Sequence, residues 1–202
     1  MKSVFSEENK IIPVVVINSV SEAASVLGAL RDAGIKVAEI TFRTACAKDA
    51  IAEGVKLFPD MLIGAGTVIN AAQCTQAIEA GAGFIVSPGF SREVLGVCRK
   101  NDITYIPGAV TPTEIMTLLA ENITVIKFFP AEAYGGIKTL KALSSAFPGA
   151  KFMPTGGIGP DNMEDYLKLP FIQAIGGSWM LKGTPDEIKE LSAQAVRKAE
   201  NI

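Results

Sequence analysis

The 202-residue sequence contains no histidine. This absence excludes Ser-His-Asp triads, imidazole general bases and most zinc sites. Cysteine is also scarce, because only Cys46, Cys74 and Cys98 are present and no CxxC pair occurs. An odd number of cysteines is a poor disulfide framework, so we expect buried thiols that act as small hydrophobic residues in a reducing compartment. Any catalysis must therefore use lysine, carboxylates, hydroxyls, arginine or backbone dipoles.

The sequence also lacks an excess of basic charge and a long hydrophobic run. Its 19 Lys and Arg residues against 21 Asp and Glu residues give a net charge of −2, so no basic face favours nucleic acid. The apolar run 11–17 contains Pro13 and is too short to span a bilayer. Glu7 and Glu8 interrupt any hydrophobic leader. We therefore expect a soluble, cytoplasmic protein without a nucleic-acid or membrane partner.

Short apolar runs alternate with segments of helix length along the whole chain. This alternation predicts βα units and a parallel sheet. Eight units in residues 1–202 favour a single-domain (β/α)₈ (TIM) barrel, with a short extra helix expected before Ile11. A doubly wound open sheet is the alternative, although its usual GxGxxG turn is absent after the first run. The eight runs are residues 12–17, 37–42, 62–68, 84–89, 104–110, 125–132, 151–157 and 171–178.

Several residues mark the expected helix ends. The segments 111–114 and 184–187 each read Thr-Pro-x-Glu, which predicts a threonine N-cap, a proline at N1 and a capping glutamate at N3. Asn70 is expected to cap another helix. Gly34 and Gly81 fit the residue that follows a helix end.

Lys127 stands in the most apolar of these runs, between Ile126 and Phe128. Lysine is rarely buried, because removing an ammonium group from water is costly. Burial in such a strand would lower the pKa of the lysine and leave a neutral amine, which is a nucleophile towards carbonyl carbons. The run therefore suggests a Schiff-base lysine. The alternative is an edge-strand lysine whose charged end reaches solvent.

Alternation along two other strands adds polar groups to the barrel interior. In the run 37–42 the apolar residues share one face, which leaves Glu39 and Thr41 pointing inward and Arg43 at the C-terminal mouth. The same pattern turns Lys127 inward and brings Thr155 to the interior near the top. A structural ion pair is the competing explanation for the charges.

Glycine pairs follow the last two runs, at Gly156-Gly157 and Gly176-Gly177. In barrels the loops after strands seven and eight often bind phosphate through backbone N–H groups, and glycine lets an anion approach closely. Tight turns are the alternative use of these pairs. Thr67, which ends the run 62–68, is equally compatible with binding a carboxylate and with a structural turn.

Seven motifs stand in one order along the chain, namely EITFRT (39–44), GAGTV (64–68), SPG (87–89), IPG (106–108), KFFPAE (127–132), PTGGI (154–158) and IGGSW (175–179). Together they resemble the 2-keto-3-deoxy-6-phosphogluconate (KDPG) and 4-hydroxy-2-oxoglutarate (KHG) aldolases over nearly the whole chain. The resemblance implies a class I aldolase on a (β/α)₈ barrel, a homotrimer, that needs no metal or other cofactor. Its implied reaction splits KDPG into pyruvate and glyceraldehyde 3-phosphate, and KHG into pyruvate and glyoxylate.

The resemblance also implies a role for each matching residue. Lys127 matches the Schiff-base lysine and Glu39 the general acid/base. The residues that match substrate-binding positions are Arg43 and Thr67 for the pyruvate carboxylate, Pro88 and Phe129 for the pyruvyl pocket, Thr155 for the hydroxylated carbons, and Gly156, Gly157, Gly176, Gly177 and Ser178 for the phosphate. Two other hypotheses remain: a phosphate-binding isomerase or synthase without a Schiff base, and a non-catalytic barrel that binds a metabolite.

Overall fold

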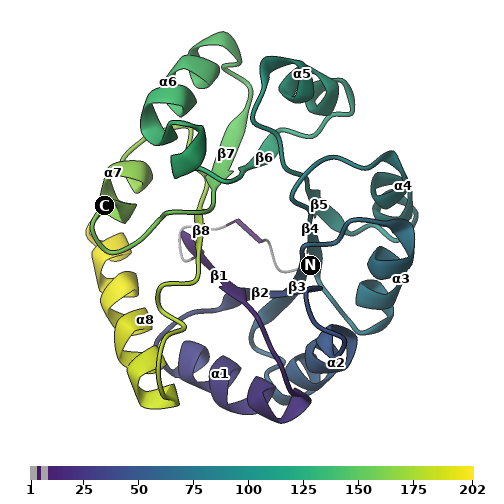
Figure 1. The fold of residues 1–202 in the computed structure, drawn as a ribbon, viewed down its shortest axis with the longest axis vertical. Helices are drawn as coiled ribbons and strands as arrows, with labels where there is room; N and C mark the ends of the chain where they lie inside the picture. Colours follow the sequence, from purple (N-terminus) through teal and green to yellow (C-terminus); the bar gives the residue numbers. More distant parts are fainter. Residues whose placement is uncertain (1–3, 6–8) are drawn as a thin grey trace.

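The computed structural model describes residues 4–5 and 9–202, which form eight parallel strands, each followed by a helix (Figure 1). The expected (β/α)₈ barrel is therefore confirmed. The short helix expected before Ile11 falls mainly on residues 1–3 and 6–8, which lie outside the described residues. The elements are β1 (Ile11–Val15), α1 (Val20–Asp32), β2 (Val37–Thr41), α2 (Ala47–Leu57), β3 (Leu62–Gly66), α3 (Ala71–Glu79), β4 (Phe84–Val86), α4 (Arg92–Lys100), β5 (Thr104–Ile106), α5 (Pro112–Ala120), β6 (Val125–Phe128), η1 (Glu132–Tyr134), α6 (Gly136–Ala146), β7 (Lys151–Pro154), α7 (Met163–Leu167), β8 (Ile175–Gly177) and α8 (Pro185–Glu200).

The strands close into a ring by two kinds of pairing. Six strands form one sheet in the order β5-β4-β3-β2-β1-β8, and β6 pairs with β7. Isolated bridges join the two sheets, at Gly108 with Lys127 between β5 and β6, and at Thr155 with Gly176 between β7 and β8. Closure leaves no free sheet edge among the described strands. Each strand is shorter than the run that predicts it, as at β5, which ends before Pro107 because proline has no N–H to donate.

Two apolar layers lie on the two faces of the strands. The outer layer packs strand residues such as Ala38 and Ile40 against the helices. The inner layer fills the barrel interior and includes residues at the starts of strands, such as Ile12, Val37 and Phe84, as expected for a packed barrel rather than a pore. The inner cluster consists of Val4, Ile12, Val37, Phe84, Val86, Ile106, Met153 and Ala174.

The helix ends agree with their sequence signals. The Thr111 and Thr184 side chains each accept the backbone N–H of the glutamate at N3. The carboxylate of that glutamate accepts the backbone N–H of the threonine, so both capping boxes are confirmed. The Asn70 side chain accepts the Gln73 N–H. Gly34 and Gly81 adopt φ of 93° and 92°, the left-handed conformation that follows many helices.

The cysteines differ from one another in burial. Cys74 and Cys98 are buried as expected, but Cys46 is only half-buried, so the expectation is wrong for it. Cys46 directly precedes α2, on the side of the barrel where the strands end, and its Sγ lies 3.3 Å from the Ile17 carbonyl oxygen. The Sγ atoms of Cys74 and Cys98 lie 3.5 Å apart, and the contact with Cys74 and then burial raise the pKa of the Cys98 thiol. Both buried sulfurs therefore belong to the packing between α3 and α4.

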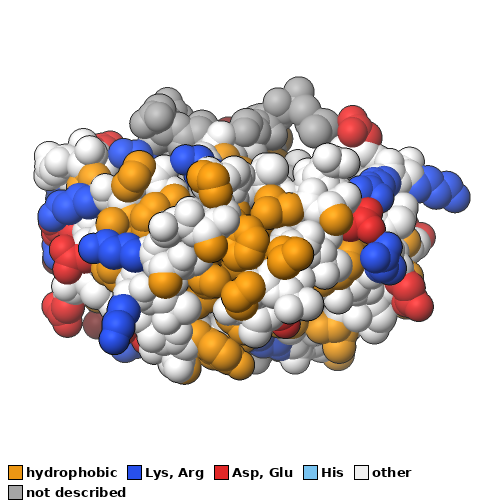
Figure 2. Space-filling model, turned by 90° about the horizontal axis from the view of Figure 1, so that it is seen from above, with side chains coloured by type: hydrophobic (Ala, Val, Ile, Leu, Met, Phe, Trp, Pro, Cys, Tyr) orange, Lys and Arg blue, Asp and Glu red, His pale blue; other side chains and the backbone are white. Residues whose placement is uncertain are grey.

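Across the described residues, none of the helices combines the length and the apolar character needed to cross a bilayer. On the outside of the barrel, Figure 2 shows hydrophobic side chains gathered on the side where α5 and α6 lie. Met116 on α5 is 61% exposed, and Tyr134 in η1, just before α6, is 50% exposed. Large exposed apolar side chains in one area are typical of an interaction surface.

Candidate active site

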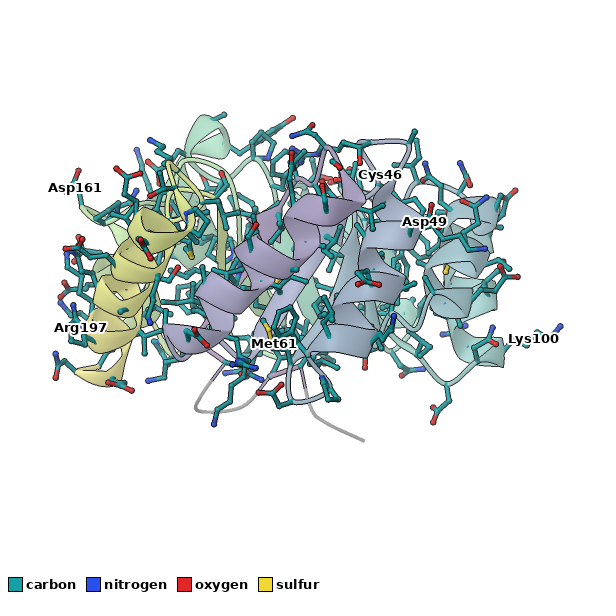
Figure 3. The ribbon with its side chains drawn as sticks, turned by 90° about the horizontal axis from the view of Figure 1, so that it is seen from below. Cys46, Asp49, Met61, Lys100, Asp161 and Arg197 are labelled. Atoms are coloured by element: carbon teal, nitrogen blue, oxygen red, sulfur yellow. The ribbon has the colours of Figure 1, made fainter. Side chains whose placement is uncertain are left out.

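The C-terminal ends of the strands open at one end of the barrel. In Figure 3, Cys46 and Asp161, which follow β2 and β7, lie at the upper end. Met61 and Lys100, which precede β3 and β5, lie at the lower end. Because the strands are parallel, every loop after a strand contributes to the upper end. Barrel active sites are found at this end.

Lys127 and Glu39 meet inside the barrel. Lys127 stands on β6 and is 3% exposed, and Glu39 stands on β2 and is 0% exposed. The Lys127 Nζ donates to Glu39 Oε1 at 3.2 Å. The alternative of an edge-strand lysine whose charged end reaches solvent is therefore wrong. The inward orientation deduced from alternation is confirmed for both residues. The Phe129 ring lies 5.4 Å from the same Nζ, a distance at which an aromatic face stabilises a cation.

Two buried oxygens of the predicted site residues have no hydrogen-bond partner among the described residues. They are Oε2 of Glu39 and Oγ1 of Thr155, which follows β7. Buried polar atoms normally have partners, so these two atoms suit the oxygens of a bound molecule or of water. A Cβ on Gly66 would lie 2.7 Å from Glu39 Oε1, so glycine there leaves room for the carboxylate. Gly176 leaves room for the Thr155 side chain in the same way.

Arg43 and Thr67 meet at the mouth of the barrel. The Arg43 Nε donates to Thr67 Oγ1 at 3.1 Å, and the arginine is exposed. Thr67 has φ of 57°, which is uncommon for a β-branched residue. Backbone strain of this kind concentrates at functional sites. The remaining guanidinium N–H groups are available for an anion such as a carboxylate.

Pro88 is fixed at the mouth by its neighbours. Ser87 is buried and donates its hydroxyl to the Val68 carbonyl at 2.5 Å. The Pro88 carbonyl occupies the space that a side chain on Gly108 would need, so glycine at 108 lets the loop after β4 approach the loop after β5. Pro88, like Phe129, is half-buried.

The two glycine pairs occupy different backbone environments. Gly156 and Gly157 follow β7 with φ of 96° and 81°, a left-handed conformation that favours glycine. Gly176 and Gly177 instead lie within β8 and are buried, and the Trp179 ring covers Gly177. Trp179 packs against the core. Ser178 follows β8 and is exposed.

Sequence reasoning missed one polar pair at this end. Glu132, the last residue of the KFFPAE motif, accepts the hydroxyl of Tyr166 from α7. Tyr166 is fully buried. The available signal was the charge of Glu132 at the end of the apolar run 125–132, but nothing in the sequence indicates its partner 34 residues later.

Comparisons with known proteins agree on one family. The family model "Aldolase: KDPG and KHG aldolase" matches residues 3–198. The chain is 40% identical over 195 residues to the KHG/KDPG aldolase of Escherichia coli strain K12, covering 94% of this chain and 92% of that protein. It is 42% identical over 207 residues to the 2-dehydro-3-deoxy-phosphogluconate aldolase of Pseudoalteromonas atlantica, covering 100% and 96% of the two chains.

A solved structure is equally similar. The KDPG aldolase of Legionella pneumophila superposes with a TM-score of 0.85 at 40% identity, covering 98% of both chains. That crystal structure holds pyruvate captured as a covalent carbinolamine intermediate.

Proposed function

Because the chain belongs to the KDPG and KHG aldolase family, we propose that it is a class I aldolase that cleaves KDPG into pyruvate and glyceraldehyde 3-phosphate. KHG, cleaved into pyruvate and glyoxylate, is the second proposed substrate. The observation that carries the mechanism is the buried contact between Lys127 and Glu39 at 3.2 Å. An amine beside a carboxylate in a water-poor interior has what imine chemistry needs, namely a nucleophile and a group that exchanges protons with it.

The proposed reaction begins at Lys127. Its amine, after passing a proton to Glu39, attacks the C2 ketone to give a carbinolamine. Glu39 returns that proton as the carbinolamine loses water, which leaves an iminium that withdraws electrons from C3. Glu39 then accepts the proton of the C4 hydroxyl, the C3–C4 bond breaks, and an aldehyde and an enamine result. Glu39 returns a proton to C3 of the enamine, and one water molecule hydrolyses the imine to release pyruvate. The unpartnered Oε2 of Glu39 supports this role, because it is the oxygen available to the C4 hydroxyl or to a bridging water.

The other candidate residues orient the substrate in this proposal. Arg43 and Thr67 bind the pyruvate carboxylate at the mouth, where their mutual hydrogen bond holds the guanidinium. Pro88 and Phe129 bound the pyruvyl group. The Thr155 hydroxyl, which has no partner among the described residues, hydrogen-bonds a substrate hydroxyl. This arrangement holds the keto carbon near the amine, which lowers the entropic cost of attack.

The glycine-rich end binds the phosphate in this proposal. Gly156 and Gly157 offer N–H groups from a left-handed turn. Gly176 and Gly177 at the end of β8, with Ser178 directly after it, complete the site. Binding by backbone dipoles suits a phosphate without needing a nearby arginine.

We also propose that three copies of the chain assemble into a homotrimer. The resemblance to the family implies this assembly, and the exposed Met116 and Tyr134 give it an apolar surface on the side of α5 and α6. Sedimentation equilibrium measures the mass of the assembly directly. A monomer at working concentrations would contradict the proposal.

Borohydride trapping tests the covalent mechanism. Incubation with pyruvate and sodium borohydride should reduce the imine and attach a stable adduct to the peptide that contains Lys127, detected by mass spectrometry. Lys127→Arg should give no adduct and no cleavage of KDPG. Lys100→Arg, which changes an exposed lysine at the opposite end of the barrel, is the matched control and should behave as the wild type. Absence of an adduct on the folded wild-type protein would refute the mechanism.

Cleavage rates for KDPG, its galactonate epimer and KHG, measured side by side, test the substrate. A preference for KDPG over KHG would support a working phosphate site. Equal rates would show that the glycine-rich end contributes little to specificity.

A further inference from the structure

The segment after β6 runs beside the loop after β7. The Ala131 N–H donates to the Thr155 carbonyl at 2.8 Å, and the Glu132 N–H donates to the Gly156 carbonyl at 3.1 Å. These bonds extend the pairing of β6 with β7 beyond the ends of both strands. The KFFPAE motif therefore reaches from the amine of Lys127 to the glycine-rich loop.

The side chain of Glu132 lies against this loop. A Cβ on Gly157 would lie 2.5 Å from Glu132 Cγ, so the glutamate packs where any side chain at 157 would stand. The Glu132 carboxylate accepts the Tyr166 hydroxyl through Oε1. Gly136 leaves space for this contact, since a Cβ there would lie 2.7 Å from both the Glu132 Oε1 and the Tyr166 Oη.

Tyr166 provides a rigid anchor for the glutamate. The tyrosine is fully buried, whereas Glu132 is exposed. Burial, and then the hydrogen bond and charge of Glu132, raise the pKa of Tyr166, so its hydroxyl stays protonated and able to donate at neutral pH. On another part of the loop, the Asn162 Nδ2 donates to the Gly157 carbonyl at 3.0 Å, and Asn162 Oδ1 accepts the Gly159 N–H at 2.9 Å.

We infer that Tyr166 and Glu132 are positioning residues for the phosphate end of the substrate, an inference that rests on the proposed aldolase function. A loop that binds an anion through backbone N–H groups binds it best when those groups are oriented beforehand, because ordering the loop on binding costs affinity. A carboxylate does not attract phosphate, so the place of Glu132 beside Gly157 argues for holding the backbone rather than contacting the ligand. Specificity for a phosphorylated substrate then depends on a hydrogen bond that the substrate never touches.

Kinetics on ligands with and without phosphate test the inference. Tyr166→Phe removes only the hydroxyl, and we expect the KM for KDPG to rise roughly three- to tenfold, the factor that corresponds to one net hydrogen bond. The kcat for KDPG should stay unchanged. Pyruvate carries no phosphate, so the KM for exchange of its methyl protons with deuterium, followed by NMR, should not change.

Variants of Glu132 make the test independent of the fold of the Tyr166 variant. Glu132→Ala changes an exposed residue and should raise the KM for KDPG in the same way. Glu132→Gln keeps an oxygen acceptor for the Tyr166 hydroxyl, so its KM for KDPG should equal that of the wild type. Glu200→Ala removes an exposed carboxylate from the last residue of α8 and should leave all constants unchanged.

Two results would overturn the inference: an unchanged KM for KDPG in Tyr166→Phe and Glu132→Ala, or equal losses with KDPG and pyruvate. A wild-type protein that forms no borohydride adduct would instead refute the proposed function itself.

Discussion

Removal of either member of the Lys127–Glu39 pair should destabilise the fold strongly. The side chains are 4% and 1% exposed, and Nζ and Oε1 lie 3.2 Å apart. Coulomb's law with an effective dielectric constant of about 20 gives an attraction of roughly 5 kcal/mol at this distance. Loss of one partner leaves an unpaired buried charge, so Lys127→Met or Glu39→Met should each lower the free energy of unfolding by about 3 to 5 kcal/mol.

The double variant should behave in the opposite way. Replacing both residues with methionine removes both desolvation costs, so its free energy of unfolding should equal or exceed that of the wild type, by up to roughly 4 kcal/mol. Urea unfolding without substrate, followed by circular dichroism, gives the four free energies of this double-mutant cycle. The double variant should nevertheless have no aldolase activity, which would separate stability from chemistry at one site.

A surface pair provides the control for burial. Lys48 Nζ and Glu79 Oε2 lie 2.8 Å apart, closer than the buried pair, but their side chains are 44% and 58% exposed. Solvent screens such a pair, so Lys48→Met should cost less than about 1 kcal/mol. Two results would refute the reasoning. One is that Lys127→Met destabilises the protein no more than Lys48→Met does. The other is that the decrease in the free energy of unfolding of the double variant equals the sum of the decreases of the two single variants.

Two further predictions follow from local contacts. Gly66→Ala places a Cβ 2.7 Å from Glu39 Oε1, so the carboxylate must move. We expect kcat for KDPG cleavage to fall roughly 10- to 100-fold in a folded protein, as for a misplaced catalytic group. An unchanged kcat would contradict the packing described. The Thr184 backbone N–H and then its hydroxyl lower the pKa of Glu187, so this carboxylate stabilises the fold above its unfolded pKa and the stabilisation is lost as the pH falls through the folded value. Thermal melts from pH 6 to pH 3 should therefore show a smaller acid-induced decrease in Tm for Glu187→Gln than for the wild type, and parallel curves would exclude the capping contribution.

Much of the barrel was predictable because its signals are local. Alternation along a strand fixes which side chains share a face, and this alone placed Glu39 and Lys127 inside the barrel. The Thr-Pro-x-Glu segments fixed the starts of α5 and α8, because capping bonds join residues three positions apart.

The unpredicted features depend on contacts between distant segments. The Tyr166 hydroxyl reaches Glu132 only because α7 lies beside η1, and the Cys74–Cys98 contact arises only from the packing of α3 against α4. Periodicity carries no information about which side chains of separate elements touch. The glycines within β8 show the same limit, because the Thr155 and Trp179 side chains that occupy the space beside them come from other positions in the chain.

The apolar cluster inside the lower barrel has a consequence for the direction of the proposed reaction. Ile12, Val37 and Phe84 are at most 1% exposed and fill the interior on the N-terminal side, so water for imine hydrolysis enters by the same mouth through which the aldehyde leaves. In the proposed reaction the enamine on Lys127 therefore meets whichever molecule occupies that mouth. When aldehyde is abundant, we expect it to reach the enamine before hydrolysis is complete, so that the same site joins carbon to carbon instead of separating them.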